Sequence, residues 1–259
     1  MKKEFCIDQL HVSICDTRME MAENAALKAG KAIISMLQSK TALNIIFAAA
    51  PSQDEFLEAL THQPGITWEK INAFHMDEYI GLPADAPQGF GNYLKERIFK
   101  KVPFGSVNLI NGQQSSPETE CARYARLLHE FSADIVFMGI GENGHIAFND
   151  PHVALFNDPE IVKIVDLDLV SRIQQVHDGC FNDLDLVPRQ ALTLTIPALL
   201  SAKRIFCVVP GKTKAKAALN TVQKPVVEEY PSTILRKHPS AELFLDADSA
   251  MLIHENAHL

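Results

Sequence analysis

Short apolar runs alternate with longer amphipathic stretches through almost the whole chain. Continuous apolar runs of this length are typical of strands that are buried on both faces of a sheet. We predict strands at residues 42–48, 71–74, 107–110, 135–138, 161–165, 191–194, 205–209 and 243–245. We predict helices after Thr17 as far as Leu37, from about Ser52 onward, and over residues 91–99, 117–131 and 212–222. This order favours an α/β fold with a mostly parallel central sheet and helices on both faces.

No feature of the sequence divides the chain into parts. Its 259 residues suit one large domain, and no Gly/Ser-rich or Pro-rich linker and no repeat interrupts them. We therefore expect a single domain over residues 1–259.

The net charge of −8 argues against a general nucleic-acid binder, which would carry a basic excess. No apolar run approaches the ~20 residues of a membrane helix, and the first residues lack the apolar stretch of a signal peptide. The five cysteines are widely spaced and form no Cys-x-x-Cys pair, which is typical of reduced thiols. We predict a cytoplasmic protein with no nucleic-acid or membrane partner.

Three segments that follow predicted strands are polar or rich in glycine, at residues 48–53, 75–79 and 139–145. In parallel α/β sheets, ligands bind beyond the carboxyl ends of the strands. The three segments therefore predict a ligand site at that edge of the sheet.

The third segment contains Gly139-x-Gly141-x-x-Gly144, which formally matches a dinucleotide-binding fingerprint. That fingerprint needs a helix to begin there and run on, whereas Pro151 would end any helix within two turns. We therefore expect no dinucleotide, and we expect the glycines to let the backbone approach another ligand closely.

His145 follows these glycines, and three interpretations of it stay open. It could be a hydrogen-bonded core residue, an acid/base oriented by Asn143 and Asp150, or a metal ligand. The chain has no His-Glu-x-x-His or comparable ligand spacing, so the metal interpretation ranks last and we predict no metal.

Gly211-Lys212-Thr213 resembles the end of a P-loop, but Phe206 occupies the position of the required first glycine. What remains is a helix whose first turn carries Lys212 and Lys214, where a phosphate or carboxylate could bind. Solvated surface lysines are the alternative.

Asp77 and Glu78 are adjacent carboxylates that follow an apolar strand. Both cannot easily point inward, so we expect one to face the site and the other to cap or pair elsewhere. Asp77 and His145 together would make an acid/base couple. No Gly-x-Ser-x-Gly segment and no cysteine with a matching histidine offers a strong nucleophile.

Two segments resemble the hallmarks of glucosamine-6-phosphate deaminases (isomerases). They are His75-Met-Asp-Glu-Tyr-Ile-Gly-Leu-Pro83 and Gly139-Ile-Gly-Glu-Asn-Gly-His-Ile-Ala-Phe-Asn-Asp-Pro151, and the resemblance extends through most of the chain. It implies a modified Rossmann-like sheet and a cofactor-free enzyme that converts an amino-sugar phosphate into a ketose phosphate and ammonia. The substrate would be glucosamine 6-phosphate or a related phosphosugar, and a homo-oligomer is compatible with the resemblance.

The resemblance also implies roles for four catalytic residues. Asp77 falls on the base that moves a proton from C2 to C1, and His145 falls on the ring-opening histidine. Asn143 and Asp150 fall on the two acidic positions that orient this histidine, commonly Asp and Glu.

For substrate binding, the resemblance places Lys214 on the lysine that binds the phosphate and Ser52 on the threonine of the phosphate loop. Ala50 and Gln53 flank Ser52, and Gly144 is among the glycines expected close to the ligand. We predict these five residues as the substrate-binding set.

The chain departs from the family at four places. Its loop reads Ala49-Ala-Pro-Ser-Gln53 in place of Thr-Gly-x-Thr-Pro, so Pro51 removes an amide donor. Asn143 carries no charge, and Asp150 is one methylene shorter than Glu, which shortens its reach. The phosphate-binding arginine would fall near His177. Phosphate contacts are therefore expected from amides near Ser52, from Lys214, and from Lys212 and His177.

Two other functions stay open. A 6-phosphogluconolactonase-like hydrolase shares the Gly-x-Gly-x-x-Gly-His segment but lacks Met-Asp-Glu-Tyr. A non-catalytic sugar-phosphate sensor of the same fold is the second alternative, because the altered phosphate loop and Asn143 favour binding without turnover.

Overall fold

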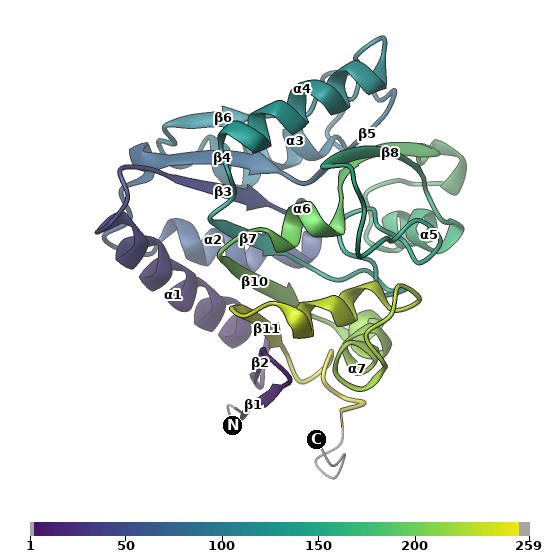
Figure 1. Ribbon diagram of the computed structural model, residues 1–259. Helices are drawn as coiled ribbons and strands as arrows, with labels where there is room; N and C mark the ends of the chain where they lie inside the picture. Colours follow the sequence, from purple (N-terminus) through teal and green to yellow (C-terminus); the bar gives the residue numbers. More distant parts are fainter. Residues whose placement is uncertain (1–2, 254–259) are drawn as a thin grey trace.

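The computed structural model describes residues 3–253. Within them, an eight-stranded sheet forms the centre of the fold (Figure 1). Its strands in spatial order are β1 (Lys3–Ile7), β2 (Leu10–Ile14), β11 (Ala241–Leu245), β10 (Arg204–Val209), β7 (Ile135–Met138), β3 (Leu43–Phe47), β4 (Ile71–His75) and β6 (Ser106–Asn108). Neighbours are parallel except β1 and β2, which are antiparallel. The predicted mostly parallel sheet is confirmed.

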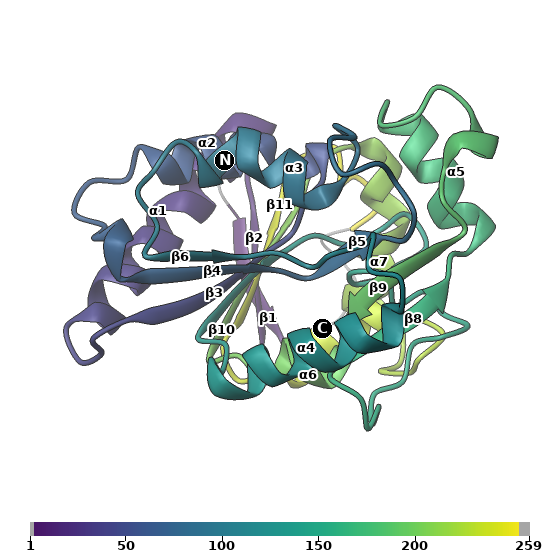
Figure 2. The ribbon, with the colours of Figure 1, turned by 90° about the horizontal axis from the view of Figure 1, so that it is seen from above.

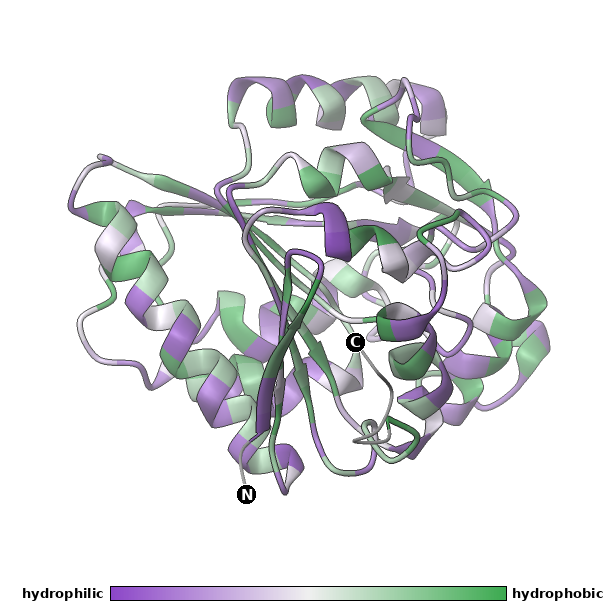
Figure 3. Ribbon diagram, turned by 60° about the horizontal axis from the view of Figure 1, so that its bottom comes forward, coloured by the Kyte–Doolittle hydropathy of each residue, from purple (hydrophilic) through white to green (hydrophobic). Residues whose placement is uncertain are grey.

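Helices cover both faces of this sheet, as predicted. The helices of the described residues are α1 (Arg18–Leu37), α2 (Asp54–Thr61), α3 (Phe90–Leu94), α4 (Pro117–Glu130), α5 (Leu169–His177), α6 (Ile196–Leu200) and α7 (Ala215–Gln223). Figure 2 shows α1, α2 and α3 on one face and α4 and α6 on the other. In Figure 3 the central strands are mainly hydrophobic, whereas the flanking helices carry both hydrophobic and hydrophilic residues.

Helix α1 begins where the sequence provides a cap. The Thr17 hydroxyl accepts a hydrogen bond from the Glu20 amide at 3.1 Å, which satisfies one free donor of the first turn. The buried face of α1 consists largely of alanines, including Ala22, Ala25 and Ala29. These small side chains let α1 lie close to the sheet, and burial of this face stabilises the helix.

Phe137 of β7 joins the core beneath the helices. Its ring centroid lies 5.3 Å from that of Phe47, 5.1 Å from that of Phe56 and 5.8 Å from that of Phe206. Phe47 and Phe206 belong to the strands on either side of β7, and Phe56 belongs to α2. One fully buried ring thus connects three strands and a helix.

Two predicted strands lie outside the parallel sheet, which corrects the sequence prediction. β8 (Val162–Asp166) and β9 (Gln190–Leu194) form a separate antiparallel sheet with the short strand β5 (Asp77–Tyr79), in the order β5-β9-β8. The middle strand β9 is buried from Ala191 to Leu194, and three of these four residues are apolar. Burial on both faces produces the same pattern in antiparallel and parallel sheets, and the pattern therefore could not separate them.

Several elements were not predicted, namely β1, β2, β5, α5 and α6. Three predicted helices also contain tighter or wider turns at one end. A 3₁₀ turn (Pro51–Gln53) precedes α2, a π-helical turn (Lys95–Phe99) continues α3, and a 3₁₀ turn (Lys212–Lys214) precedes α7. Further 3₁₀ turns are Trp68–Lys70, Leu184–Leu186 and Pro231–Lys237. No helix follows the Gly139–Gly144 segment, as predicted.

The direction in which the chain builds the sheet reverses beside β3. After β3 the chain adds β4 and β6 on one side, and it then returns to place β7, β10 and β11 on the other. At such a reversal the connections leave in opposite directions, and a crevice opens at the carboxyl ends of the strands. The topology thus places a candidate site at the ends of β3 and β7.

Truncation of the central ring should reduce stability strongly. We expect Phe137→Ala to lower the free energy of unfolding by about 3–5 kcal/mol, because a buried aromatic is replaced by a cavity. Val107→Ala on the edge strand β6, where the side chain is 39% exposed, should cost less than about 1 kcal/mol. Urea unfolding followed by circular dichroism measures both, and equal losses would contradict the central role of Phe137.

Candidate active site

A pocket lies at this reversal and is lined by the segments that follow four neighbouring strands, β4, β3, β7 and β10. Its lining includes most of the predicted site residues: Ala50, Ser52, Gln53, Asp77, His145 and Lys214. Residues separated by more than 160 positions in the sequence therefore meet in one cavity. Asn143, Asp150 and Gly144 lie outside the lining, as described below.

The loop after β3 is held in place by Gln53. Its amide Nε2 donates to the Val208 carbonyl at 3.0 Å and to the Ser52 hydroxyl at 3.1 Å. Its backbone amide closes the 3₁₀ turn on the Ala50 carbonyl at 2.8 Å. A buried amide thus ties this loop to β10 and fixes the Ser52 hydroxyl at the pocket wall.

Asp77 and Glu78 separate as expected, one toward the pocket and one away from it. Asp77 begins β5 and lines the pocket, with only 6% of its surface exposed. Glu78 caps the start of α3: its carboxylate accepts from the Phe90 amide at 2.9 Å and the Gly91 amide at 2.8 Å. The prediction that the two carboxylates divide these roles is confirmed.

The environment of Asp77 disfavours its charge. Burial raises the pKa of its carboxyl well above the ordinary value, and the neighbouring charge of Glu78 adds to this effect. A carboxyl with a raised pKa is a stronger base once it is ionised, which suits proton abstraction.

The glycine turn brings His145 into the pocket. Gly144 has a φ of +89°, which lets the chain reverse, and its amide donates to the Gly141 carbonyl at 3.0 Å. The His145 ring lies directly over Gly141, where a Cβ atom would come within 2.1–2.3 Å of it. Gly141 therefore provides the space for the ring. Gly144, predicted to bind the ligand, instead shapes the turn, because its amide is already used and it does not line the pocket.

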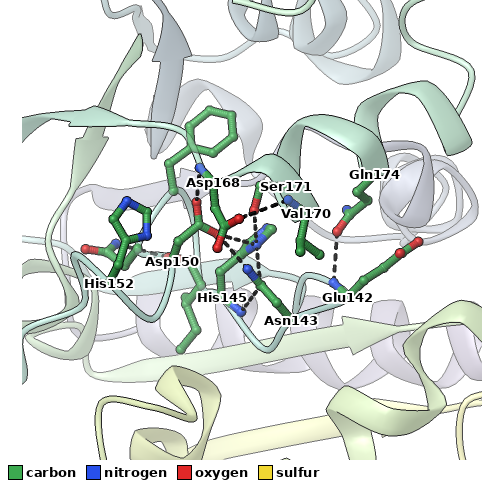
Figure 4. Close-up of polar contacts among 12 residues, drawn as sticks. Glu142, Asn143, His145, Asp150, His152, Asp168, Val170, Ser171 and Gln174 are labelled. Atoms are coloured by element: carbon green, nitrogen blue, oxygen red, sulfur yellow. Dashed lines mark hydrogen bonds and ion pairs between the residues drawn. The ribbon is translucent and has the colours of Figure 1, made fainter. Parts of the chain in front are cut away.

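Three oxygens surround Nδ1 of His145 (Figure 4). The Asn143 Oδ1 lies at 2.8 Å, the Ser171 hydroxyl at 2.9 Å and the Asp150 Oδ1 at 3.0 Å. All three can accept a hydrogen bond from Nδ1–H, which leaves Nε2 available on the other side of the ring. Asp150 therefore does reach His145 despite its shorter side chain, and Asn143 makes the hydrogen bond expected of it.

Asp150 is completely buried and remains ionised. Burial alone would raise the pKa of its carboxyl, but the His145 ring and the donors Asn143 and Ser171 outweigh burial and hold it well below the usual range. The Asn143 amide donates to its Oδ1 at 2.9 Å, and the Asp168 amide donates to its Oδ2 at 3.2 Å. The site thus keeps a fixed negative charge beside the imidazole.

Helix α5 supplies residues that the sequence analysis missed. Asp168 caps it by accepting from the Val170 amide at 3.0 Å, and Ser171 lies in its first turn. Gln174 and Gln175 of the next turn line the pocket, and Gln174 accepts from the Glu142 amide at 2.8 Å. An N-cap aspartate followed by apolar residues at 169, 170, 173 and 176 is a helix signal that could have identified this element.

Lys214 is the only lysine or arginine among the described residues that line the pocket. It is 4% exposed, and burial lowers the pKa of its amine, an effect that the charges of Asp178 and Glu142 oppose. Lys212 and His177, expected as further phosphate contacts, lie outside the lining of this pocket. The Lys212 side chain is 72% exposed near Asp248, and the His177 side chain is 56% exposed near Glu142, because both point to solvent from the outer sides of their helical turns.

No cluster of three or more His, Cys, Asp or Glu in residues 3–253 could hold a metal ion. Likewise, none of the helices over this range combines the length and the hydrophobicity that a bilayer crossing needs.

Residues 16–244 match the family model of glucosamine-6-phosphate isomerases/6-phosphogluconolactonase. The chain is 32% identical to a glucosamine-6-phosphate deaminase of Streptococcus sanguinis over 88% of this chain and 95% of the relative. It is 29% identical to that of Shouchella clausii over 92% and 96%.

Among solved structures, a monomeric glucosamine-6-phosphate deaminase superposes with a TM-score of 0.84 at 29% identity, over 93% of this chain and 99% of the other. A 6-phosphogluconolactonase of Thermotoga maritima gives 0.74 at 19% identity, over 91% and 98%, and this likeness extends to the fold alone.

The close approach of Gly141 to the imidazole can be tested with a methyl group. Gly141→Ala should displace the His145 ring and break its contacts at Nδ1, which a crystal structure or a shifted His145 imidazole NMR signal would reveal. Gly91→Ala is the control, because its added Cβ would meet nothing closer than 3.4 Å. An unmoved ring in Gly141→Ala would contradict the tight packing.

The raised pKa of Asp77 predicts a pH-dependent cost in stability. The folded protein keeps this proton to a higher pH than the unfolded chain does, so stability is lost as the pH rises between the two pKa values. We expect Asp77→Asn to unfold at a higher temperature than the wild type, by a few degrees at pH 8 and by less at pH 5. Thermal unfolding at both pH values measures this effect. Asp85→Asn, at an exposed position, should change neither temperature, and a lower unfolding temperature for Asp77→Asn at pH 8 would refute the argument.

Proposed function

The chain belongs to the glucosamine-6-phosphate isomerase/6-phosphogluconolactonase family, and within it we propose that the protein is a glucosamine-6-phosphate deaminase. The reaction converts glucosamine 6-phosphate and water into fructose 6-phosphate and ammonia. The observation that carries the proposal is the meeting of the Asp77 carboxyl, the His145 imidazole and the Lys214 amine in one pocket. We also propose that residues 1–259 act as one domain in the cytoplasm.

His145 opens the sugar ring in this proposal. Its Nε2 takes the proton of the C1 hydroxyl and returns it to the ring oxygen as the bond between C1 and that oxygen breaks. Because Asn143, Ser171 and Asp150 surround Nδ1, the ring is oriented with Nε2 free for this shuttle. The buried charge of Asp150 stabilises the imidazolium that forms between the two steps.

Asp77 then carries out the isomerisation. It removes the proton at C2 of the open-chain aldehyde while O1 takes up a proton, which gives an enolamine. It then delivers the proton to C1 as the amine gives up a proton, which leaves a hydroxyl at C1 and an imine at C2. Water adds to this imine, and ammonia leaves as the C2 ketone forms. A single carboxylate can serve both carbons because they are adjacent, and its raised pKa matches the proton transfer.

Lys214 and the loop at Ala50, Ser52 and Gln53 bind the phosphate in this proposal. The four residues share the pocket wall, and Lys214 supplies the positive charge. Binding the phosphate far from the reacting carbons holds C1 and C2 against Asp77.

The lactonase alternative rests on the shared fold, because the 6-phosphogluconolactonase of Thermotoga maritima is only 19% identical to the chain. Hydrolysis of a lactone moves no proton between C1 and C2, so that reaction gives Asp77 no isomerisation role. The sensor alternative predicts binding without turnover.

Replacement of Asp77 separates these alternatives. We expect Asp77→Asn to reduce ammonia release by about 10³-fold or more, because the base is lost, while the Kd of glucosamine 6-phosphate stays within about threefold. Coupled ammonia assays and isothermal titration calorimetry measure the two quantities, with Asp85→Asn as a carboxylate control.

Three outcomes would contradict the proposal. Wild-type protein that binds the substrate and releases no ammonia would be a sensor. Faster hydrolysis of 6-phosphogluconolactone than deamination would identify a lactonase. Full activity in Asp77→Asn would exclude Asp77 as the base.

A further inference from the structure

Ser171 occupies a position that neither the sequence nor the family resemblance indicated. It lies in the first turn of α5 and is 1% exposed. Its hydroxyl donates to the Asp150 Oδ1 and lies 2.9 Å from the Nδ1 of His145. We propose that Ser171 is a positioning residue, which links the Asp150 carboxylate to the imidazole and holds His145 with its proton on Nδ1.

The directions of the hydrogen bonds support this assignment. A carboxylate can only accept, so the bond between Ser171 and Asp150 uses the hydroxyl proton of the serine. The serine oxygen is then left with its lone pairs, and toward His145 it can only accept. The Nδ1 of His145 must therefore be the donor, which fixes the proton there and leaves Nε2 to exchange protons in the pocket.

The same serine holds Asp150. Oδ1 of Asp150 receives the Ser171 hydroxyl and, at 2.9 Å, the Asn143 amide, while Oδ2 receives the Asp168 amide at 3.2 Å. Two of these three donors come from the start of α5. The carboxylate is thus prevented from rotating away from the imidazole.

Two departures from the family give this contact its importance. Asn143 contributes no charge, so Asp150 is the single acid among the three oxygens around Nδ1. Asp150 is also shorter than the glutamate common at its position. The Ser171 hydroxyl is hydrogen-bonded to both the Asp150 carboxylate and the His145 ring, so it holds the two groups together in addition to their direct 3.0 Å contact.

Ser171→Ala tests the inference, whose kinetic part rests on the proposed function. We expect kcat to fall about 10- to 100-fold with KM nearly unchanged. Ser171 contacts His145 and Asp150, but it does not line the pocket in which we propose that the phosphate binds. We also expect the Nδ1 proton of His145, followed by ¹⁵N–¹H NMR, to exchange with water at least about tenfold faster. Ser171→Thr, which keeps the hydroxyl, should restore the slow exchange and much of kcat.

Ser13→Ala is the matched control, because Ser13 is also a buried serine that donates to a carboxylate, but it lies on β2, four strands away from β3 in the sheet. It should change neither kcat nor the His145 signal. The NMR measurement needs no substrate, so it tests Ser171 even if the wild type releases no ammonia and the proposed function fails. The inference would be overturned if the Nδ1 proton of His145 exchanged at the wild-type rate in folded Ser171→Ala. It would also be overturned if Ser171→Ala lost no more kcat than Ser13→Ala.

Discussion

The pairing of β3 with β7 is the constraint on which the site depends. These strands are neighbours in the sheet but are separated in the chain by β4, β6 and their connections. The loop after β3 and the glycine turn after β7 therefore leave the sheet side by side. The last hydrogen bond between the two segments runs from the Ala48 amide to the Phe137 carbonyl, at 2.9 Å. The loop that carries Ser52 follows one strand and the imidazole of His145 follows the other, so the distance between these two parts of the pocket is set by the sheet.

Burial then sets the chemistry of the charged groups in this crevice. The same loss of solvent raises the pKa of Asp77 and lowers that of Lys214, so both groups are less readily charged than at the surface. The buried Asp150 instead has a lowered pKa and keeps its charge, because three hydrogen-bond donors and an imidazole surround its carboxylate. The chain's net charge of −8 has little influence here, since an anionic ligand meets the buried Lys214 and local hydroxyl and amide groups first.

The sequence predicted six of the eight strands of the central sheet, all except β1 and β2, and the meeting of Asp77 with His145, because apolar runs and strand ends are local signals. It could not predict partners that depend on tertiary packing. His75 and His145 both follow predicted strands, yet His75 is buried, accepts from the Ile110 amide at 2.8 Å and has a pKa lowered by burial to about 3, so it serves the fold. Lys212 and Lys214 likewise differ only in the side of the turn they occupy. Ser171 was missed because α5 itself was missed, and no local pattern links it to a histidine 26 residues earlier.

Helix α5 contacts the part of the site that departs from the family. The resemblance leads one to expect an aspartate at position 143 and a phosphate-binding arginine near position 177, and the described lining of this pocket contains neither. Position 143 holds the neutral Asn143, whose Oδ1 lies 2.8 Å from the Nδ1 of His145, and the exposed His177 lies outside the lining. From α5, the neutral amides of Gln174 and Gln175 line the pocket. The first turn of α5 then supplies Ser171 to the histidine, while its second turn supplies amide groups to the pocket, so the helix serves both halves of the altered site.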